Sequence, residues 1–323
     1  MLLNIIAVLT GFGLLIWGAD RFVAGASATA RNLGVPPLII GLTVVGFGTS
    51  APEMLVSGIA AWDGYPGIAV GNALGSNIAN IGLVLGTTAL IAPIAVNSDT
   101  LRREYPLLFV AMVLALWLMS DGYLGIMDGI LLIAGLFLMM LWVVRIGMRS
   151  RNNDPLQQEF ADEFEAGEMS TPKALLWLFV GILVLLAGSR AVVWGATEIA
   201  VAMGVSDLVI GLTIIAIGTS LPELAASIMS VIKNEHDIAV GNVVGSNMFN
   251  ILGVLGLPGL IHPFTLPAES LSRDFGVMAI LTVALFLMSF GINGRQGRIN
   301  RLEGGTLLTA YIAYMSWLYV SSV

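Results

Sequence analysis

Cysteine is absent from this 323-residue chain, and charged residues make up only 11% of it. The absence of cysteine excludes disulfides and thiolate metal sites. The 14 Lys and Arg residues are scattered between apolar runs and form no basic face, so we expect no nucleic-acid partner. Hydrophobic residues make up 57% of the chain, and the mean hydropathy is +0.91, more than a soluble domain of this size needs. The composition therefore predicts a polytopic protein of the lipid bilayer.

Ten apolar runs approach the length of about 20 residues that a helix needs to cross a bilayer. They lie near 3–24, 37–61, 67–92, 105–120 and 125–146, then near 174–196, 207–232, 237–262, 275–292 and 303–322. We therefore predict an all-α membrane protein with ten transmembrane helices. The first run ends in small residues, as a signal peptide does, but no basic region precedes it, so we expect it to be retained.

The two groups of five runs are repeats at an offset of 170 residues. The string Gly41-Leu-Thr-Val-Val-Gly-Phe-Gly-Thr-Ser-Ala-Pro-Glu53 returns as Gly211-Leu-Thr-Ile-Ile-Ala-Ile-Gly-Thr-Ser-Leu-Pro-Glu223. Five crossings per repeat would make the second half enter the membrane from the opposite side, which is typical of secondary transporters. The predicted units are a first repeat at 1–149 with its core at 37–92, a linker at 150–172, and a second repeat at 173–323 with its core at 207–262.

The basic residues predict the orientation. If the N-terminus is outside, twelve of the fourteen fall in inward-facing loops, and only Arg190 and Arg273 lie outside. The excess of positive charge on the inner side predicts a multi-pass inner-membrane protein with both termini periplasmic and the linker cytoplasmic. The linker carries six acidic residues, which would suit either a calcium sensor or a solvated connector. It lacks the ligand spacing of a calcium loop, which favours the connector.

The repeated motif combines a helix break with a carboxylate. Pro52 has no N–H, so the carbonyl of Gly48 loses its helical partner, and the helix should open near the midplane. At helical spacing Thr49 and Glu53 lie on one face, next to the loosened backbone. No Lys or Arg in the same spans could neutralise the carboxylate, so its position at membrane depth indicates a function. The second repeat carries the same arrangement at Gly218, Thr219, Pro222 and Glu223.

The next run of each repeat adds polar side chains at a spacing of four. Along one helix face, amides and hydroxyls could complete a site of hard oxygen donors, which suits calcium, sodium or magnesium. They could equally join helices by hydrogen bonds, as polar groups do in membrane bundles. These residues are Asn72, Ser76 and Asn80, then Asn242, Ser246 and Asn250.

The duplicated Gly-Thr-Ser-x-Pro-Glu, each followed by Gly-Asn-x-x-Gly-Ser-Asn-x-x-Asn, resembles the two alpha-repeats of the cation/calcium exchanger superfamily, in its bacterial and archaeal sodium/calcium exchanger branch. The similarity extends to the ten-run layout and so covers most of the chain. It implies an antiporter that exchanges calcium for sodium by alternating access.

Carried over position by position, the resemblance implies a set of ion ligands. Glu53 and Glu223 would bind both calcium and sodium, and Thr49 and Thr219 would contribute mainly carbonyl oxygens. The other candidate ligands are the carbonyls of Gly46 and Ala216, the side chains of Ser50, Ser220, Ser76 and Ser246 for sodium, and Asn80 and Asn250.

The chain departs from the family pattern in one respect. Some members carry an Asp at one of the two positions that are Asn80 and Asn250 here, so this chain offers one carboxylate fewer. That difference leaves the number of bound ions and the coupling ratio open.

Other functions compete with this interpretation. Protonated carboxylates could replace sodium, which would give a proton-coupled calcium or sodium antiporter, and paired acidic residues could also serve a cation channel. An enzyme is not expected, because the sequence has no His-Glu-x-x-His motif and no evident nucleophile–base pair. We expect no cofactor and no obligatory protein partner, with Ca²⁺ and Na⁺ as cargo and H⁺ as the alternative coupling ion.

Overall fold

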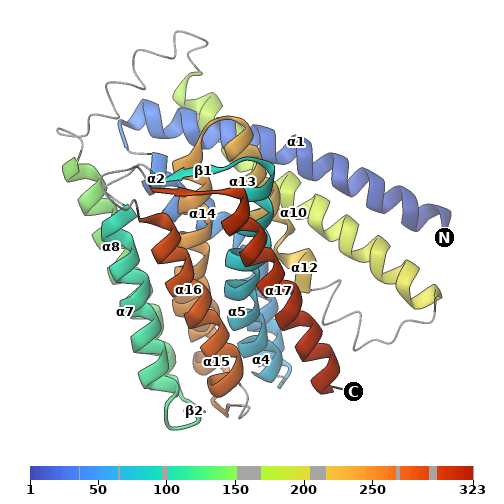
Figure 1. Ribbon diagram of the computed structural model, residues 1–323, viewed down its shortest axis with the longest axis vertical. Coiled ribbons are helices and arrows are strands. Elements are labelled where there is room, and N and C mark those ends of the chain that lie inside the picture. The colour runs from blue at the N-terminus through green and yellow to red at the C-terminus, as the bar shows by residue number, and fades with distance from the viewer. Residues whose placement is uncertain are drawn as a thin grey trace.

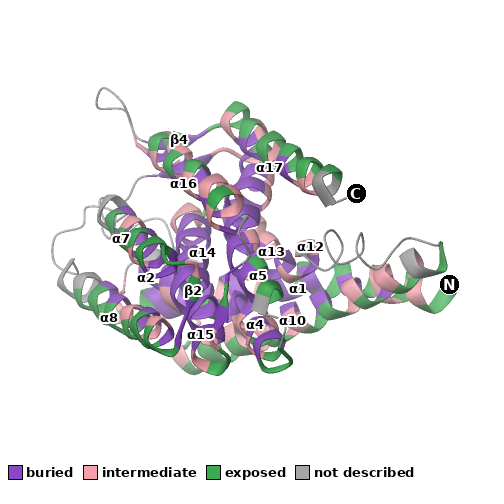
Figure 2. Ribbon diagram, turned by 90° about the horizontal axis from the view of Figure 1, so that it is seen from below, coloured by how far each residue is buried: buried purple, intermediate pink, exposed green. Residues whose placement is uncertain are grey.

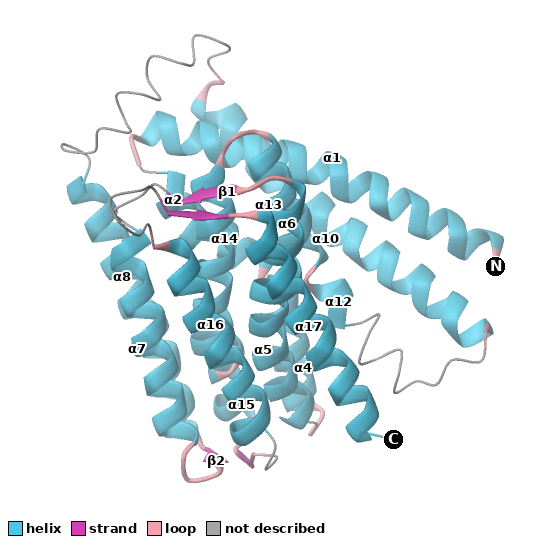
Figure 3. Ribbon diagram, in the orientation of Figure 1, coloured by secondary structure: helices cyan, strands magenta, loops and turns pink. Residues whose placement is uncertain are grey.

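The computed structural model describes residues 1–35, 37–64, 66–96, 101–150, 169–203, 216–266, 270–290 and 297–322. Most of these residues are helical (Figures 1 and 3). Six of the described helices are long and apolar enough to cross a membrane, or seven if the bent pair Gly41–Thr49 and Ala51–Trp62 forms one span. The chain is thus a helical membrane protein.

The first half contains α1 (Leu2–Leu33), α2 (Pro37–Ile40), α3 (Gly46–Thr49), α4 (Ala51–Trp62), α5 (Pro66–Ala79), α6 (Gly86–Ile91), α7 (Leu101–Met119) and α8 (Ile126–Ser150). The second half contains α10 (Thr171–Ala202), α12 (Ala216–Thr219), α13 (Leu221–Ile232), α14 (His236–Phe249), α15 (Gly256–Ile261), α16 (Gly276–Ser289) and α17 (Arg301–Ser322). Short π-helical segments are η1 (Gly41–Val45), η2 (Asn80–Leu85), η4 (Asn250–Val254) and η5 (Ser270–Phe275). Each of the ten predicted apolar runs coincides wholly or partly with helix, although ten membrane crossings remain a prediction.

Burial separates the central helices from the peripheral ones (Figure 2). Every residue of α14 from Ile238 to Phe249 is buried. By contrast, α7 and α8 expose large apolar side chains, among them Val113, Trp117 and Phe137. So many exposed large apolar side chains are typical of helices that face lipid. The polar motifs lie in the helices at the centre.

The two longest helices pack against each other in opposite directions. Both α1 and α10 have 32 residues, more than the sequence predicted, and they run side by side across the bundle (Figure 1). A Cβ added to Gly25 would lie 2.5 Å from the backbone nitrogen of Leu178, and one added to Gly188 would lie 3.0 Å from the carbonyl oxygen of Gly11. Because residue numbers rise along one helix as they fall along the other, the pair is antiparallel, and glycine allows the backbones to touch.

Two short β-ribbons, which the sequence did not predict, join the halves. β1 (Ile94–Val96) pairs antiparallel with β4 (Gly297–Ile299), with Ala95 opposite Arg298. β2 (Tyr123–Leu124) pairs with β3 (Phe264–Thr265). Both ribbons lie at ends of helices (Figure 3). The predicted linker falls mostly outside the described residues, since 151–168 are not among them.

Candidate ion-binding site

The predicted helix break is present in both repeats. In the first, α3 ends at Thr49, Ser50 adopts φ −82° and ψ 0°, and α4 starts at Ala51 after a bend of 48°. In the second, Ser220 adopts φ −88° and ψ 3° between α12 and α13. The proline follows in the first turn of the new helix. Backbone N–H groups in a first turn have no partner within the helix, so the missing N–H of proline costs the helix no hydrogen bond. The break therefore falls at the serine of each motif.

Each break places a carboxylate in the first turn of a new helix. Glu53 in α4 and Glu223 in α13 are both only 1% exposed. The helix N-terminus carries partial positive charge, which favours an anion there. None of the four carboxylate oxygens accepts a hydrogen bond of ordinary geometry from the described residues, and neither residue forms an ion pair among them. A buried charge in this condition needs compensation.

The two carboxylates lie close enough to repel each other. Each also lies beside hydroxyl-bearing residues of the other repeat: Thr49 and Ser50 neighbour Glu223, and Thr219 neighbours Glu53. The two motifs therefore meet at one place, and each repeat contributes to the surroundings of the other's carboxylate.

A second set of contacts joins the first motif to α14. The hydroxyl of Thr49 lies 3.1 Å from Oδ1 of Asn242 and 3.3 Å from the hydroxyl of Ser246. The hydroxyl of Ser246 in turn lies 3.4 Å from the carbonyl oxygen of Gly46. These four residues are buried and bring two hydroxyl and two carbonyl oxygens close together. Such oxygens suit hard cations.

Several further candidates are buried with unsatisfied polar atoms. The hydroxyls of Ser50 and Ser220, Oδ1 of Asn80, and both polar side-chain atoms of Asn250 have no hydrogen-bond partner in the described part of the chain. Of the polar side-chain atoms of these four residues, Nδ2 of Asn80 does form a hydrogen bond, which it donates to Oδ1 of Asn247 at 3.1 Å. Buried polar groups nearly always have a hydrogen-bond partner, so a cluster of unpaired ones indicates a place where an ion or water binds.

The remaining predicted ligands are also placed. Ser76 is buried on α5, while Ala216 opens α12, so that its backbone, but not its side chain, is described. The rest of the second motif before Ala216 lies outside the described residues. The other predicted ligands lie at the two helix breaks or in α14, η2 and η4, which pack against α3, α13 and α4, respectively.

Two serines that the sequence analysis missed support the site. Asn72 donates from Nδ2 to the carbonyl oxygen of Glu53 at 3.0 Å and to the hydroxyl of Ser57 at 2.9 Å. The second repeat has the same arrangement, in which Asn242 donates to the Glu223 carbonyl at 3.3 Å and to Ser227 at 3.0 Å. Both serines sit four residues after their glutamate, at the offset of 170, and that recurrence could have revealed them.

These bonds support the interhelical role that the sequence allowed for Asn72 and Asn242, since their amide nitrogens join helices and hold the glutamate backbone. A similar bond occupies one of the carbonyls freed by proline, because Ser189 of α10 donates to the carbonyl of Gly218 at 2.6 Å.

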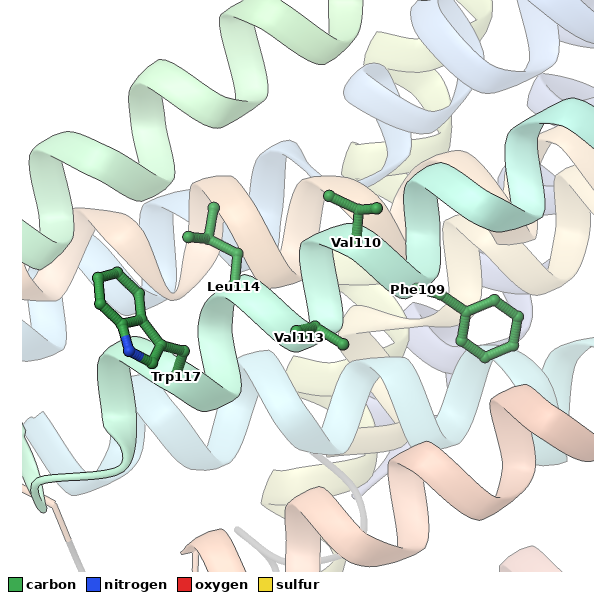
Figure 4. A pocket seen from close by; sticks show the side chains of 5 residues that line it. All are labelled: Phe109, Val110, Val113, Leu114 and Trp117. Atoms are coloured by element: carbon green, nitrogen blue, oxygen red, sulfur yellow. The ribbon is translucent and has the colours of Figure 1, made fainter.

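Other features of the described residues do not resemble an ion site. No group of three or more His, Cys, Asp or Glu residues gathers within the described ranges. A hollow on α7 is lined by apolar side chains alone, and it offers no ligand to a cation (Figure 4). Its lining residues are Phe109, Val110, Val113, Leu114 and Trp117.

A family model described as "sodium/calcium exchanger protein" matches residues 3–146 and 173–320. The chain belongs to the sodium/calcium exchanger family. CaxA of Alkalimonas amylolytica is 50% identical over 99% of this chain and 100% of its own length. The inner membrane protein YrbG of Escherichia coli is 42% identical over 99% of this chain and 98% of its own.

A solved structure extends the likeness to the fold. The sodium-calcium exchanger NCX_Mj, from crystals soaked with Na⁺ and Ca²⁺, matches with a TM-score of 0.83 and 35% identity, over 98% of both chains. The resemblance to bacterial and archaeal sodium/calcium exchangers is therefore confirmed. Members of this family are exchangers rather than enzymes.

Proposed function

We propose that the protein is an inner-membrane antiporter that exchanges Ca²⁺ for Na⁺ by alternating access. The observation that carries the proposal is the pair Glu53 and Glu223, which are buried, lie close together, and have no ion pair and no hydrogen bond of ordinary geometry to their carboxylates among the described residues. Two carboxylates in low dielectric need cations, and Na⁺ and Ca²⁺ are the ions named for the family and for NCX_Mj.

The ligand set extends from the carboxylates to neutral oxygens. Glu53 and Glu223 bind either ion, and carbonyls of Gly46, Thr49, Ala216 and Thr219 complete the calcium site. Serine hydroxyls at 50, 76, 220 and 246 serve sodium, with Asn80 and Asn250 at the edge of the site. The unpaired hydroxyls of Ser50 and Ser220 and the unpaired Asn80 and Asn250 atoms support this assignment.

Exchange follows from competition for the same charges. The two carboxylates neutralise one Ca²⁺, or sodium ions in its place, and the two sets cannot occupy the site together. An empty site retains repelling like charges, which disfavours its passage through an occluded state. Transport of one ion therefore depends on the return of the other.

The proposed architecture has ten crossings in two inverted repeats, at 1–149 and 173–323, joined by a cytoplasmic linker at 150–172, with both termini periplasmic. The antiparallel packing of α1 and α10, which occupy equivalent positions in the two repeats, supports the inversion. The distribution of Lys and Arg supports the orientation.

The test uses the purified full chain in liposomes with a calcium-sensitive dye. An outward sodium gradient should drive calcium uptake, and a proton gradient of the same size should not. Uptake driven only by protons would replace sodium with H⁺ as the coupling ion. Calcium flux that needs no counter-ion, with an ohmic current, would identify a channel, and either result would overturn the proposal.

A further inference from the structure

Two opposite charges tie α1 to the second repeat. Lys233, which caps the C-terminus of α13, places Nζ 2.7 Å from Oδ1 of Asp20 on α1. Two turns further along α1, Ser27 donates a hydrogen bond to Glu235, the residue that precedes α14. Arg21 also lies 3.7 Å from Asp20, and its guanidinium covers the ring of Trp177. We call Asp20 and Lys233 the inner charge pair, because the predicted orientation places both at the cytoplasmic side.

The repeat contains a second pair with the charges exchanged. At the offset of 170 residues, Asp20 corresponds to Arg190 of α10, and Lys233 corresponds to Asp63. Asp63 caps the C-terminus of α4 just as Lys233 caps α13, and both of these helices have twelve residues. The partners are thus equivalent in position and again opposite in sign. Arg190 and Asp63 form the outer charge pair, on the predicted periplasmic side.

In this structure the outer charge pair is apart. Arg190 and Asp63 are both exposed, and neither takes part in an ion pair among the described residues. Thr197, the equivalent of Ser27, has a buried hydroxyl without a hydrogen-bond partner there, while the equivalent of Glu235 is outside the described residues. Among the described residues, an ion pair and a hydrogen bond therefore join the helices on the inner side, and the equivalent residues on the outer side make neither.

The packing of the helices that carry the two charge pairs is also closer on the inner side than on the outer side. α1 packs along α13, whereas the equivalent helices α10 and α4 have at most marginal contact. Two halves with matching sequences therefore make unequal contacts at the two ends of the bundle. That inequality is expected of a transporter held in one of two related states.

We propose that the two charge pairs close alternately: the inner pair in the state seen here, and the outer pair in the opposite state, in which Asp20 leaves Lys233. The inference rests on the proposed alternating access between inverted repeats. When such repeats exchange conformations, contacts made at one face by one set of residues are made at the other face by their equivalents. Each pair then stabilises one closed face.

The solvent exposure of the inner charge pair limits how strongly it can shift the balance between the two states. The side chains of Lys233 and Asp20 are 30% and 36% exposed, so solvent screens their attraction. Pairs at such positions shift an equilibrium by roughly two- to fivefold rather than by orders of magnitude. The charge pairs therefore bias the balance between states without locking it.

Cross-linking tests the proposal, because the chain has no cysteine of its own. The full chain in liposomes carries either Asp20→Cys with Lys233→Cys, or Asp63→Cys with Arg190→Cys. A short bifunctional methanethiosulfonate is added in Na⁺, in Ca²⁺, or in neither ion, and intact mass records linkage. We expect the inner pair to link, transport to stop, and a reductant to restore it. The outer pair should link in at least one ionic condition.

A neutral variant supplies the second measurement. Lys233→Gln should raise the linking rate of the outer cysteine pair by about two- to fivefold, since it weakens the inner pair. Lys173→Gln, which removes an exposed charge near the start of α10, is the matched control and should leave that rate unchanged.

Three outcomes would overturn the alternation. The outer pair could fail to link in all three ionic conditions although sodium-driven calcium uptake is intact. Alternatively, a variant with all four cysteines could link both pairs in one molecule, which would mean that they close together. Finally, Lys233→Gln could leave the outer linking rate unchanged. Loss of calcium exchange in the unsubstituted protein would instead contradict the proposed function, and the linkage pattern reports on the two states independently of it.

Discussion

At the scale of single residues, position along a helix explains how two glutamates persist at the centre of a membrane protein. Each lies in the first turn after a break, where free backbone N–H groups and the helix dipole favour negative charge. That stabilisation amounts to about 1–2 kcal/mol at best, less than the desolvation of a buried charge. The remainder has to come from a bound cation or from a proton on the carboxylate, and under the proposed function we expect the protein's stability to depend on its cargo.

The first prediction concerns these carboxylates. Ca²⁺ at about 100 times its dissociation constant should stabilise the unsubstituted protein by about 2.7 kcal/mol, which raises its unfolding temperature in detergent. Glu53→Gln and Glu223→Gln should each abolish this rise and reduce calcium exchange on the order of 100-fold, because removing one charge from a buried ion contact costs about 3 kcal/mol.

The matched control is Glu198→Gln, which neutralises an exposed glutamate on α10. It should retain both the calcium-dependent rise and the exchange rate. A Glu53→Gln protein that still gained stability from calcium would place the ion elsewhere.

The second prediction concerns the serines behind the site. Ser227→Ala removes the hydroxyl that accepts from Asn242, so the amide loses one of its two acceptors and holds the Glu223 backbone less firmly. A lost hydrogen bond of this kind costs about 1 kcal/mol, and calcium affinity should fall by roughly fivefold in binding calorimetry. Ser230→Ala is the control, because Ser230 is equally buried on α13 but donates only to Ala226 of its own helix. Equal losses in the two variants would assign the effect to α13 in general.

At the scale of elements, the close packing of α1 on α10 depends on glycine at particular positions. The third prediction compares Gly25→Ala with Gly13→Ala in the same helix. A Cβ at position 25 meets the backbone of α10, at Leu178 and Ala174, and should cost about 1–3 kcal/mol. A Cβ at position 13 has nothing within 4 Å and should stabilise α1 by up to about 1 kcal/mol through helix propensity. Unfolding temperatures in detergent distinguish the two, and a stable Gly25→Ala protein would argue against this helix contact.

The helices and their breaks were largely predictable from the sequence, whereas the contacts between elements were not. Apolar runs predicted the helices and a Pro in each repeated motif predicted the breaks, because both depend on local backbone chemistry. The glutamates stood out because a charge in an apolar run is costly. The bonds from Asn72 to the Glu53 carbonyl and to Ser57 could not be read from spacing alone, since they require the angle between two helices. The same applies to β1 and β4, which pair across most of the chain.

At the scale of the whole molecule, the fourth prediction concerns topology. Ten crossings put both termini on one side, and the basic residues predict that this side is the periplasm. A reporter that is active only in the periplasm, fused after the last residue, should be active, while the same reporter inserted in the linker at 150–172 should not. Activity at the linker alone would reverse the orientation, and activity at only one terminus in a pair of N- and C-terminal fusions would rule out an even number of crossings.

The ribbon of β1 with β4 has a consequence for biogenesis. The backbone groups of 94–96 find their strand partner only when residues 297–299 have been made, roughly 200 residues later. At a synthesis rate of about 5–20 residues per second, a nascent chain waits on the order of 10–40 s with that edge unpaired. Completion of the N-terminal half is therefore tied to the last part of translation, and a chain that ends before Gly297 would leave the edge of residues 94–96 without its strand partner.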